Sequence, residues 1–426
     1  QGEYATANDR LVWPGSHAPV TRAQTGGFAS GVGVFGNGSP TSSLYLYRFD
    51  ESGDTLWTRH MYTDTSVVIR KCIQSANGDF LLVGLHYPPQ NAFLCRADSM
   101  GELISFTVID DVPAFFAMGI AEDTDRDLYI CGFGQSIEQN NSNNANLVKC
   151  DPQGNVIWRR TWPRSSSYNQ AIITQDNGVV TIGYRNLNAD ESNTAFVTKY
   201  TTDGVMLWST DIVSSDLPLR DCGLLDGFEM PDGSLAVCGT IRNTTIPGLW
   251  DNGMLHKLDA EGNVLWSRYY AHYTGLPVGF DQVFNAVQPT RDGGFILTGV
   301  AEGPSPPNTQ RLWLVKLDSL GCLVPGCHTV GVQDHVMGLQ GALQLAPNPL
   351  PAGAPLRVVF EPPAGFKVKG ALRVVIVDAL GQAVHTDQLG GAPSSSLLYP
   401  SLRPGMYYLH LADGTSWLAG GKVVVE

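Results

Sequence analysis

The chain has 426 residues, of which 43% are hydrophobic and only 16% are charged, and 47 are glycine, a composition that favours a turn-rich all-β protein. The chain has a net charge of −13, of which residues 1–340 carry −14, and it has no cluster of Lys and Arg, so we expect no binding to nucleic acid or to an anionic membrane surface. No apolar run reaches the roughly 18 residues that a membrane-spanning helix needs, so we expect no transmembrane segment.

The N-terminal residues predict a processed start and an isolated strand. The chain begins at Gln1 with neither a Met nor a secretory leader, which we interpret as the result of signal-peptide removal. Residues 25–36 predict a strand that no other strand precedes. Their GVGVFG matches the pattern GxGxxG, but Asn37-Gly38-Ser39-Pro40 and another strand follow. No helix N-terminus is therefore available to hold a pyrophosphate, and a dinucleotide site is rejected.

A repeat then runs through most of the chain. Its best copy, residues 253–300, has a strand that ends in Lys257 and Asp259, a glycine turn, a strand through Trp266, and a hairpin that leads into a last strand. Alternating apolar residues bounded by Asn-Gly, Asp-Gly and Gly-Gly turns predict strands. Weaker copies begin near residues 44, 92, 146 and 196, and an incomplete copy spans 312–324.

Four-stranded repeats of about 50 residues indicate the blades of a β-propeller. We expect six blades in residues 1–328, with the N-terminal strands completing the sheet that residues 312–324 begin, because joining the two ends leaves no open sheet edge. A seventh blade stays open if residues 1–24 contain further strands. The tryptophans that recur once in each copy indicate packing between blades. They are Trp57, Trp158, Trp208 and Trp266.

Asp123, Asp125 and Asp127 form the most metal-like pattern in the chain. They alternate as the first ligands of a calcium loop do. They also occupy the position of the hairpin turn in the other repeats, where Asp and Asn are expected as turn residues. Calcium is therefore a weak candidate cofactor, and we expect no other. The scattered histidines have no metal-ligand spacing, and no GxSxG motif is present, so no catalytic residue is assigned.

Three aromatic residues outside the repeat pattern are candidates for contact with a partner. Trp162 follows a strand, Trp250 lies in an insertion, and His272 lies in a loop that is rich in tyrosine. Loop aromatics of this kind contact sugars or proteins. The alternative for each is ordinary packing.

Two of the eight cysteines predict a disulfide. Cys322 and Cys327 flank Pro325-Gly326, a turn that can bring their sulfurs together, and this bridge implies an oxidising compartment. Cys222 and Cys238, on neighbouring strands, are a weaker candidate pair. For the other cysteines, buried thiols and further bridges stay open.

The repeat stops at the incomplete copy, and a second domain follows. Residues 329–345 indicate a linker, and residues 346–426 contain alternating strands that predict a small immunoglobulin-like β-sandwich. Four segments stand out in it. They are APNPL at 346–350, VVIVDALGQAVH at 374–385, LRPGMYYLHL at 402–411, and Lys422 to Val425.

This order of segments resembles the C-terminal sorting domain of proteins that the type IX secretion system of Bacteroidetes exports. The resemblance covers the last 80 or so residues, and residues 318–327 look like the end of propeller cargo proteins of that group. It implies export through the periplasm and across the outer membrane, with an outer-membrane β-barrel of the machinery holding the tail. In that family the tail is commonly cleaved. The positions that match the motifs are Pro347, Asn348, Pro349, Asp378, Gly381, Gly405, Tyr407, Lys422, Val423 and Val424.

Three functions stay open. The first is a secreted or cell-surface protein whose propeller binds a glycan or a protein without catalysis, since no catalytic constellation is recognisable and binding residues are usually in loops. The second is a glycan-active enzyme with paired carboxylates on one face of the propeller. The third is a structural subunit of a surface assembly that retains its tail as a connector.

Overall fold

The structure is a computed structural model. The residues that it describes are 11–13, 20–35, 42–61, 66–87, 90–112, 114–135, 143–162, 165–186, 193–212, 219–243, 251–272, 281–303, 309–327, 335–339, 341–362, 366–368, 370–414 and 416–426. The chain divides into two compact units, Gln1–Asp211 and Ile212–Glu426. The regular elements in the described ranges are β-strands, which confirms the all-β class, and none of these residues forms a helix long and apolar enough to cross a membrane.

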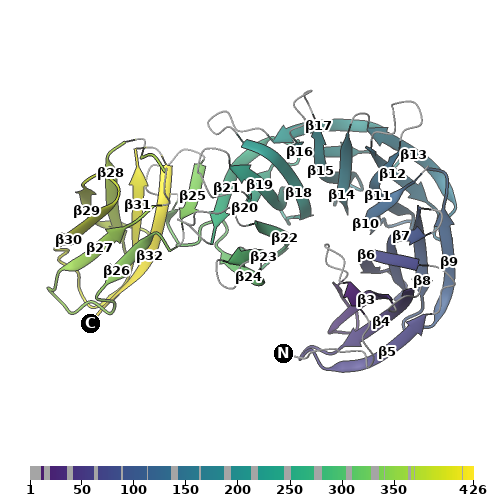
Figure 1. The fold of residues 1–426 in the computed structure, drawn as a ribbon, viewed down its shortest axis with the longest axis horizontal. Helices are drawn as coiled ribbons and strands as arrows, with labels where there is room; N and C mark the ends of the chain where they lie inside the picture. Colours follow the sequence, from purple (N-terminus) through teal and green to yellow (C-terminus); the bar gives the residue numbers. More distant parts are fainter. Residues whose placement is uncertain are drawn as a thin grey trace. The chain divides into compact units, whose positions relative to one another are not determined.

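The first unit consists of successive antiparallel sheets whose strands follow one another in chain order (Figure 1). Three of these sheets have four strands, and in the sheet nearest the N-terminus β1 and β2 both pair with β3. The strands are β1 (Leu11–Trp13), β2 (Val20–Arg22), β3 (Phe28–Phe35), β4 (Ser42–Phe49) and β5 (Thr55–Met61); β6 (Ser66–Gln74), β7 (Phe80–Tyr87), β8 (Asn91–Ala97) and β9 (Leu103–Ile109); β10 (Phe116–Glu122), β11 (Leu128–Gln135), β12 (Asn143–Cys150) and β13 (Val156–Trp162); and β14 (Ser166–Ile173), β15 (Val179–Asn186), β16 (Asn193–Tyr200) and β17 (Met206–Ile212).

The second unit continues the pattern and adds a C-terminal domain. The fifth sheet contains β18 (Leu219–Glu229), β19 (Leu235–Asn243), β20 (Asp251–Leu258) and β21 (Val264–Ala271), and the sixth contains β22 (Gln282–Pro289), β23 (Phe295–Gly303) and β24 (Thr309–Leu317). The remaining strands are β25 (His335–Leu339), β26 (Leu343–Ala346), β27 (Leu356–Phe360), β28 (Leu372–Val377), β29 (Ala383–Leu389), β30 (Ser394–Leu398), β31 (Gly405–Asp413) and β32 (Ser416–Val425).

Within each unit, consecutive sheets pack face to face around apolar cores, as the blades of a β-propeller do. In the first unit, Ala29, Leu44 and Leu46 of the first sheet pack with residues of the second sheet such as Phe80 and Phe93. The second and third sheets share a further core, as do the third and fourth, and in the second unit the fifth and sixth. The array is thus propeller-like in its repeating sheets, and the number of blades stays a prediction.

A glycine in the second strand of five sheets is required by close backbone contact. The strand before it contains a β-bulge, and a Cβ at the glycine would lie 1.8–1.9 Å from a carbonyl oxygen of that bulged strand. Any side chain would therefore force the two strands apart. These glycines are Gly84, Gly132, Gly183, Gly239 and Gly299.

An ion pair also recurs, between a basic residue near the end of the third strand and an acid in the hairpin turn that joins the first two strands of the same sheet. The distances range from 2.6 to 3.2 Å. This contact accounts for the basic residue that stands two positions before the Asp or Thr at the start of the next turn in these repeats. The pairs are Arg96–Asp79, Lys149–Asp127, Lys199–Asp176, Lys257–Asp232 and Lys316–Asp292.

Two sequence-based boundaries in the repeat array are wrong. The copy at residues 253–300 was expected to form one sheet, but its first two strands belong to the fifth sheet and its last strands to the sixth. A periodic sequence gives the length of the unit and leaves open where the unit starts. The strand of residues 25–36 was expected to complete the sheet of residues 312–324, but it forms β3, which pairs with β1 and β2 on one edge and with β4 on the other.

The C-terminal domain is continuous with the fifth sheet. Residues 329–345, for which the sequence indicated a linker, include β25, which pairs in parallel with β21 on one side and with β32 on the other. A nine-stranded sheet results, in the order β18-β19-β20-β21-β25-β32-β31-β28-β29. Its C-terminal strands face a second sheet, β26-β27-β30, across a core that includes Phe360, Val374 and Leu411. The proposed division into residues 1–328 and 346–426, and the immunoglobulin-like character of the latter, stay predictions.

Candidate functional site

Of the four C-terminal segments that resemble the sorting domain, the first (residues 346–350) and the last (Lys422 to Val425) lie side by side. The Asn348 side chain joins them, because its Nδ2 donates to the Lys422 carbonyl oxygen at 2.7 Å and its Oδ1 accepts from the Val424 N–H at 3.0 Å. The Leu350 N–H also donates to the Val424 carbonyl oxygen at 2.7 Å. Asn348 therefore fixes the segment that contains Pro347 and Pro349 against β32.

The two middle segments complete the same body. Asp378 forms the turn between β28 and β29, since its Oδ1 accepts from the N–H groups of Leu380 and Gln382 at 2.9 Å and Gly381 follows with φ +79°. β31 pairs with β28 and with β32, so that Tyr407 lies opposite Val423 and Gly405 opposite Val425. The structure thus brings the matched residues together in one domain, most of them around β31 and β32.

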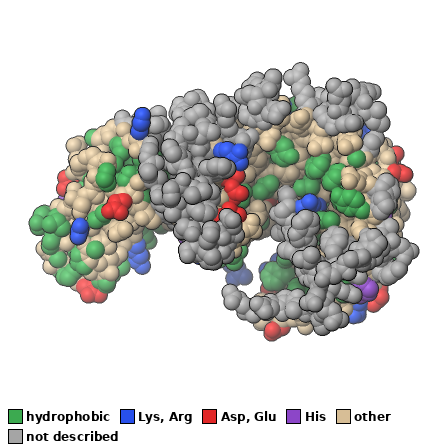
Figure 2. Space-filling view, viewed as in Figure 1, with side chains coloured by type: hydrophobic (Ala, Val, Ile, Leu, Met, Phe, Trp, Pro, Cys, Tyr) green, Lys and Arg blue, Asp and Glu red, His purple; other side chains and the backbone are tan. Residues whose placement is uncertain are grey.

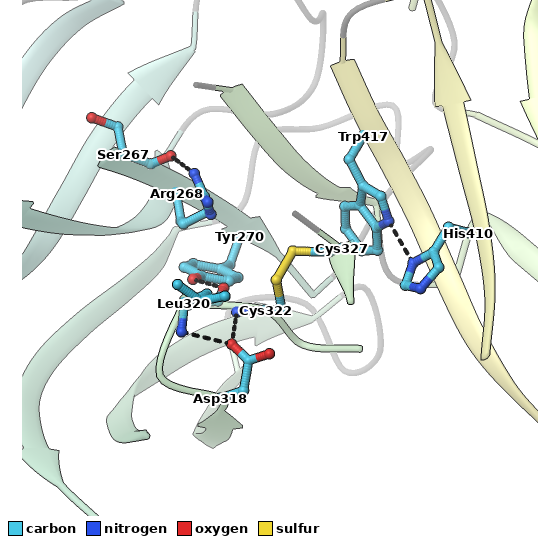
Figure 3. Close-up of a disulfide and its surroundings, with 10 residues drawn as sticks. Ser267, Arg268, Tyr270, Asp318, Leu320, Cys322, Cys327, His410 and Trp417 are labelled. Atoms are coloured by element: carbon cyan, nitrogen blue, oxygen red, sulfur yellow. Dashed lines mark hydrogen bonds between the residues drawn. A yellow bond between two sulfur atoms is a disulfide. The ribbon is translucent and has the colours of Figure 1, made fainter. Parts of the chain in front are cut away.

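The expected disulfide between Cys322 and Cys327 is present, and it lies beside this domain (Figure 3). Both cysteines are buried, and they pack with Val375 and Val377 of β28 and with Trp417 of β32. The other proposed pair is wrong, because Cys222 and Cys238 are thiols. Cys238 Sγ lies 4.0 Å from the Phe284 carbonyl oxygen.

The turn before the disulfide is held on β21. Asp318 Oδ1 accepts from the N–H groups of Leu320 and Cys322 at 2.9 and 2.8 Å, and the Tyr270 hydroxyl donates to the Gly321 carbonyl oxygen at 2.7 Å (Figure 3). Burial raises the pKa of the Tyr270 phenol far above its usual value, so the hydroxyl stays a donor. A Cβ at Gly321 would meet the Trp266 ring at 2.9 Å. The turn therefore fits closely against the fifth sheet.

On the side of the C-terminal domain, Trp417 is the largest fully buried side chain in the described residues. Its Nε1–H donates to His410 Nδ1 at 3.0 Å, and its ring packs beside the disulfide (Figure 3). Trp417 lies outside the repeat and the four C-terminal segments, and His410 is not one of the positions that match the sorting motifs. A signal was available, since Trp417 is the sole tryptophan after residue 313 and lies in a strand of a small domain.

The aspartates proposed as weak calcium ligands stabilise a turn. Asp123 Oδ1 accepts from the N–H groups of Asp125 and Asp127, at 3.0 and 2.9 Å. The Tyr129 hydroxyl donates to Asp123 Oδ2 at 3.0 Å, and the Lys149 ammonium lies 2.9 Å from Asp127. This ammonium supplies a positive charge beside two of the three carboxylates. In the described parts of the chain, no group of three or more His, Cys, Asp or Glu side chains is arranged to hold a metal ion.

The aromatic residues proposed for partner contact have different surroundings. Trp162 is half-buried at the end of β13 in the third sheet. The centre of its ring lies 5.7 Å from that of Phe196 and 4.6 Å from the Arg185 guanidinium, both of the fourth sheet, so Trp162 packs between these two sheets. His272 is exposed beside Trp313, with 6.2 Å between the ring centres. Trp250 lies outside the described residues.

The C-terminal domain also has hydrophobic side chains on its surface, as Figure 2 shows at the left. The exposed fractions of the four side chains named below range from 45% to 83%. Leu380 and Val384 belong to the β28–β29 hairpin, whereas Leu397 and Tyr399 belong to the end of β30 and the residue after it. This domain therefore buries one set of apolar residues at the disulfide and exposes another.

No family model matches the chain, and no curated protein matches it. Among solved structures it is similar to a protein of unknown function from Bacteroides caccae, with 10% identity and a TM-score of 0.40 over 65% of this chain and 87% of that one. It is similar to the β-propeller domain of the Trilobed protease from Pyrococcus furiosus, with 13% identity and a TM-score of 0.38 over 82% and 90% of the two chains. It is also similar to the WD40 domain of Neurospora crassa Pan2, with 13% identity and a TM-score of 0.37 over 71% and 95%.

Proposed function

We propose that this protein is exported by a type IX secretion system to the cell surface or the medium, with its C-terminal domain as the sorting signal. The observation that carries the proposal is the pair of hydrogen bonds from the Asn348 side chain to Lys422 and Val424. These bonds join the first and last of the segments that resemble the sorting domain. Segments that are 74 residues apart in the chain thus form one surface that export machinery can read.

The propeller-like array is proposed as a binding scaffold that does not catalyse a reaction. Its sheets are built from recurring turns, ion pairs and bulge glycines, which serve packing, so residues specific to a partner belong to the connecting loops. The proposed partner is a surface glycan or a surface protein. The partner of the C-terminal domain is the export machinery, through a β-barrel protein of the outer membrane.

The export proposal is tested by fusing residues 341–426 to a periplasmic reporter in a bacterium with a type IX system. We expect the reporter to reach the medium or the cell surface, and to stay in the periplasm of a strain without the system. Asn348→Ala should reduce export, because both hydrogen bonds to β32 are lost. The matched control is Gln344→Ala, an exposed residue of the neighbouring strand β26.

Two results would contradict the proposal. Export that continues unchanged in the strain without the type IX system would exclude this route. A reporter that stays in the periplasm of the complete strain, while the fusion is folded and resists proteolysis, would exclude the sorting role of the domain.

A further inference from the structure

The segment after β24 differs from its counterparts in the earlier sheets. In the fifth sheet, the turn at Asp259 leads directly into the fourth strand, β21. In the sixth sheet, the matching turn at Asp318 leads into the short loop that the Cys322–Cys327 disulfide closes. We name residues 318–327 the disulfide loop. It occupies the position in the chain where a fourth strand begins in the other sheets.

The disulfide loop has two apolar sides. Leu323 packs against the core that the fifth and sixth sheets share, which includes Tyr270 and Phe295. The next residue, Val324, packs with the cluster of Val377 and Trp417 in the C-terminal domain. A Cβ at Gly420 of β32 would lie 3.2 Å from the Val324 side chain, so the loop approaches this strand closely. The loop therefore connects the array and the C-terminal domain through side chains.

A second connection runs through the backbone. β25 pairs with β21 over five residue pairs, from Ser267 opposite His335 to Ala271 opposite Leu339. Its other edge meets β32 at Val336 and Trp417. Backbone hydrogen bonds and apolar packing therefore act at the same junction.

Separation of the two parts would expose side chains that are now almost completely buried. Trp417 and Val377 are each 1% exposed, as is Cys322, and Cys327 is fully buried. Burial of an aromatic ring and several aliphatic side chains favours association, because it removes apolar surface from water. The closed loop presents Val324 in a fixed position, which lowers the entropy lost on docking.

We propose that the disulfide loop is a docking element that keeps the C-terminal domain bound to the sheet array even when the chain between them is cut. The domain is then a permanent subunit of the protein, rather than a tail that leaves once it has been cleaved. This docking does not depend on the export route proposed above, and purified protein tests it without any export machinery.

The test uses the full chain with the site of a specific protease introduced directly after Cys327. After cleavage, the two fragments are separated by gel filtration under native, non-reducing conditions. We expect them to elute together at the volume of the uncut protein and to separate in denaturant. Wild-type fragments that separate under native conditions would overturn the proposal, whatever the variants do.

Two variants then test the role of the loop. Val324→Asp places a charge against the Trp417 cluster, and we expect the cleaved fragments to dissociate at least about tenfold faster than in the parent protein. The matched control is Leu320→Asp in the same loop, because Leu320 is 36% exposed and lies outside both apolar clusters. Equal effects of the two substitutions would refute the specific role of Val324. Circular dichroism of each uncut variant separates loss of docking from loss of folding.

The disulfide is tested by replacing both cysteines with serine. A cross-link that closes a short loop restricts its open conformations. We therefore expect the cleaved Cys322→Ser/Cys327→Ser protein to dissociate about tenfold faster, and reduction of the cleaved parent to have the same effect. An unchanged dissociation rate in both experiments would show that the loop does not need its disulfide to dock.

Discussion

The third strands of the fifth and sixth sheets, β20 and β24, occupy the same position in the repeat but have different environments. Leu255 of β20 is fully buried, whereas Leu314, at the matching position of β24, is 58% exposed. The position two residues earlier is Gly253 in β20 and Leu312 in β24, which is 81% exposed. The other side of β24 is buried, because Trp313 and its alternate neighbours pack on the core shared with the fifth sheet. The face of β20 that contains Leu255 is buried because the sixth sheet packs on it, whereas the corresponding face of β24, with Leu312 and Leu314, is exposed.

Substitution of the two matched leucines has the largest expected effect. Leu255→Ala opens a cavity in the core of the fifth and sixth sheets and should lower the free energy of unfolding by about 3 kcal/mol. Leu314→Ala removes an exposed side chain and should change it by less than about 0.5 kcal/mol. Urea denaturation of both variants measures the difference. A loss for Leu314→Ala as large as that for Leu255→Ala would mean that the face of β24 is covered in the folded protein.

The fifth and sixth sheets share a glycine in the second strand that lies against the β-bulge of the first strand, Gly239 in one sheet and Gly299 in the other. A Cβ at Gly239 or at Gly299 would lie 1.9 or 1.8 Å from a backbone oxygen, so each Gly→Ala change should cost about 2–3 kcal/mol of unfolding free energy. The control is Gly293→Ala, where a Cβ meets nothing within 4 Å and only the φ of +79° opposes alanine, at about 1 kcal/mol. Thermal unfolding compares the three variants. Tolerance at Gly299 alone would show that the sixth sheet is more loosely paired than the fifth.

The turn at Asp318 ties the end of the sixth sheet to the fifth. Tyr270→Phe removes the hydroxyl that donates to the Gly321 carbonyl oxygen and should lower the free energy of unfolding by about 1 kcal/mol. Tyr399→Phe is the control, because Tyr399 is 70% exposed in the C-terminal domain. Denaturation curves of the two variants that coincide would show that this hydrogen bond does not stabilise the turn.

The smallest expected effect concerns pH and the ion pair of the fifth sheet. Hydrogen bonds from the Ser234 hydroxyl and N–H, with a smaller contribution from Lys257, lower the pKa of Asp232 to about 2. A lowered folded-state pKa stabilises the protein above the usual aspartate pKa, and this contribution is lost as the pH falls towards 2. The carboxylate is largely exposed, so the contribution is a few tenths of a kcal/mol at most.

NMR titration of the Asp232 carboxyl carbon measures this pKa directly. Ser234→Ala should raise it more than Lys257→Met does, because the Ser234 hydrogen bonds are its main cause. A midpoint near the ordinary aspartate value in the parent protein would contradict the interpretation. Asp292 of the sixth sheet, paired with Lys316 at 2.8 Å, should also titrate below the usual range.

Local features of the fold were predictable from the sequence, whereas non-local pairings were not. Asp318 and Gly321, like Asp259 and Gly262, predict a turn because the Asp side chain accepts backbone N–H groups and the glycine adopts a positive φ. The disulfide follows from the Pro325-Gly326 turn between its cysteines. These signals lie within a few residues of one another, so a single sequence contains them in full.

The pairing of β25 lacks such a signal. Its five residues have no strong alternation and no hairpin turn that joins them to β21, with which they pair in parallel. A parallel partner lies far away in the sequence, so neither spacing nor turn residues identify it. For the same reason, residues 329–345 resemble a linker in the sequence, and no local signal there indicates the contact between the disulfide loop and Trp417.

The parallel strand β25 has a consequence for the order in which the protein is completed during synthesis. The outer edge of β21 is formed early, but its partner begins only at His335, and β25 in turn meets β32, which ends at Val425. A nascent chain that has left the ribosome up to the sixth sheet therefore still has an open strand edge, of the kind that pairs wrongly with other chains. The strand that covers this edge, β25, follows the sixth sheet in the chain, so premature termination before β25 would leave the repeat array with an open edge that is prone to aggregation.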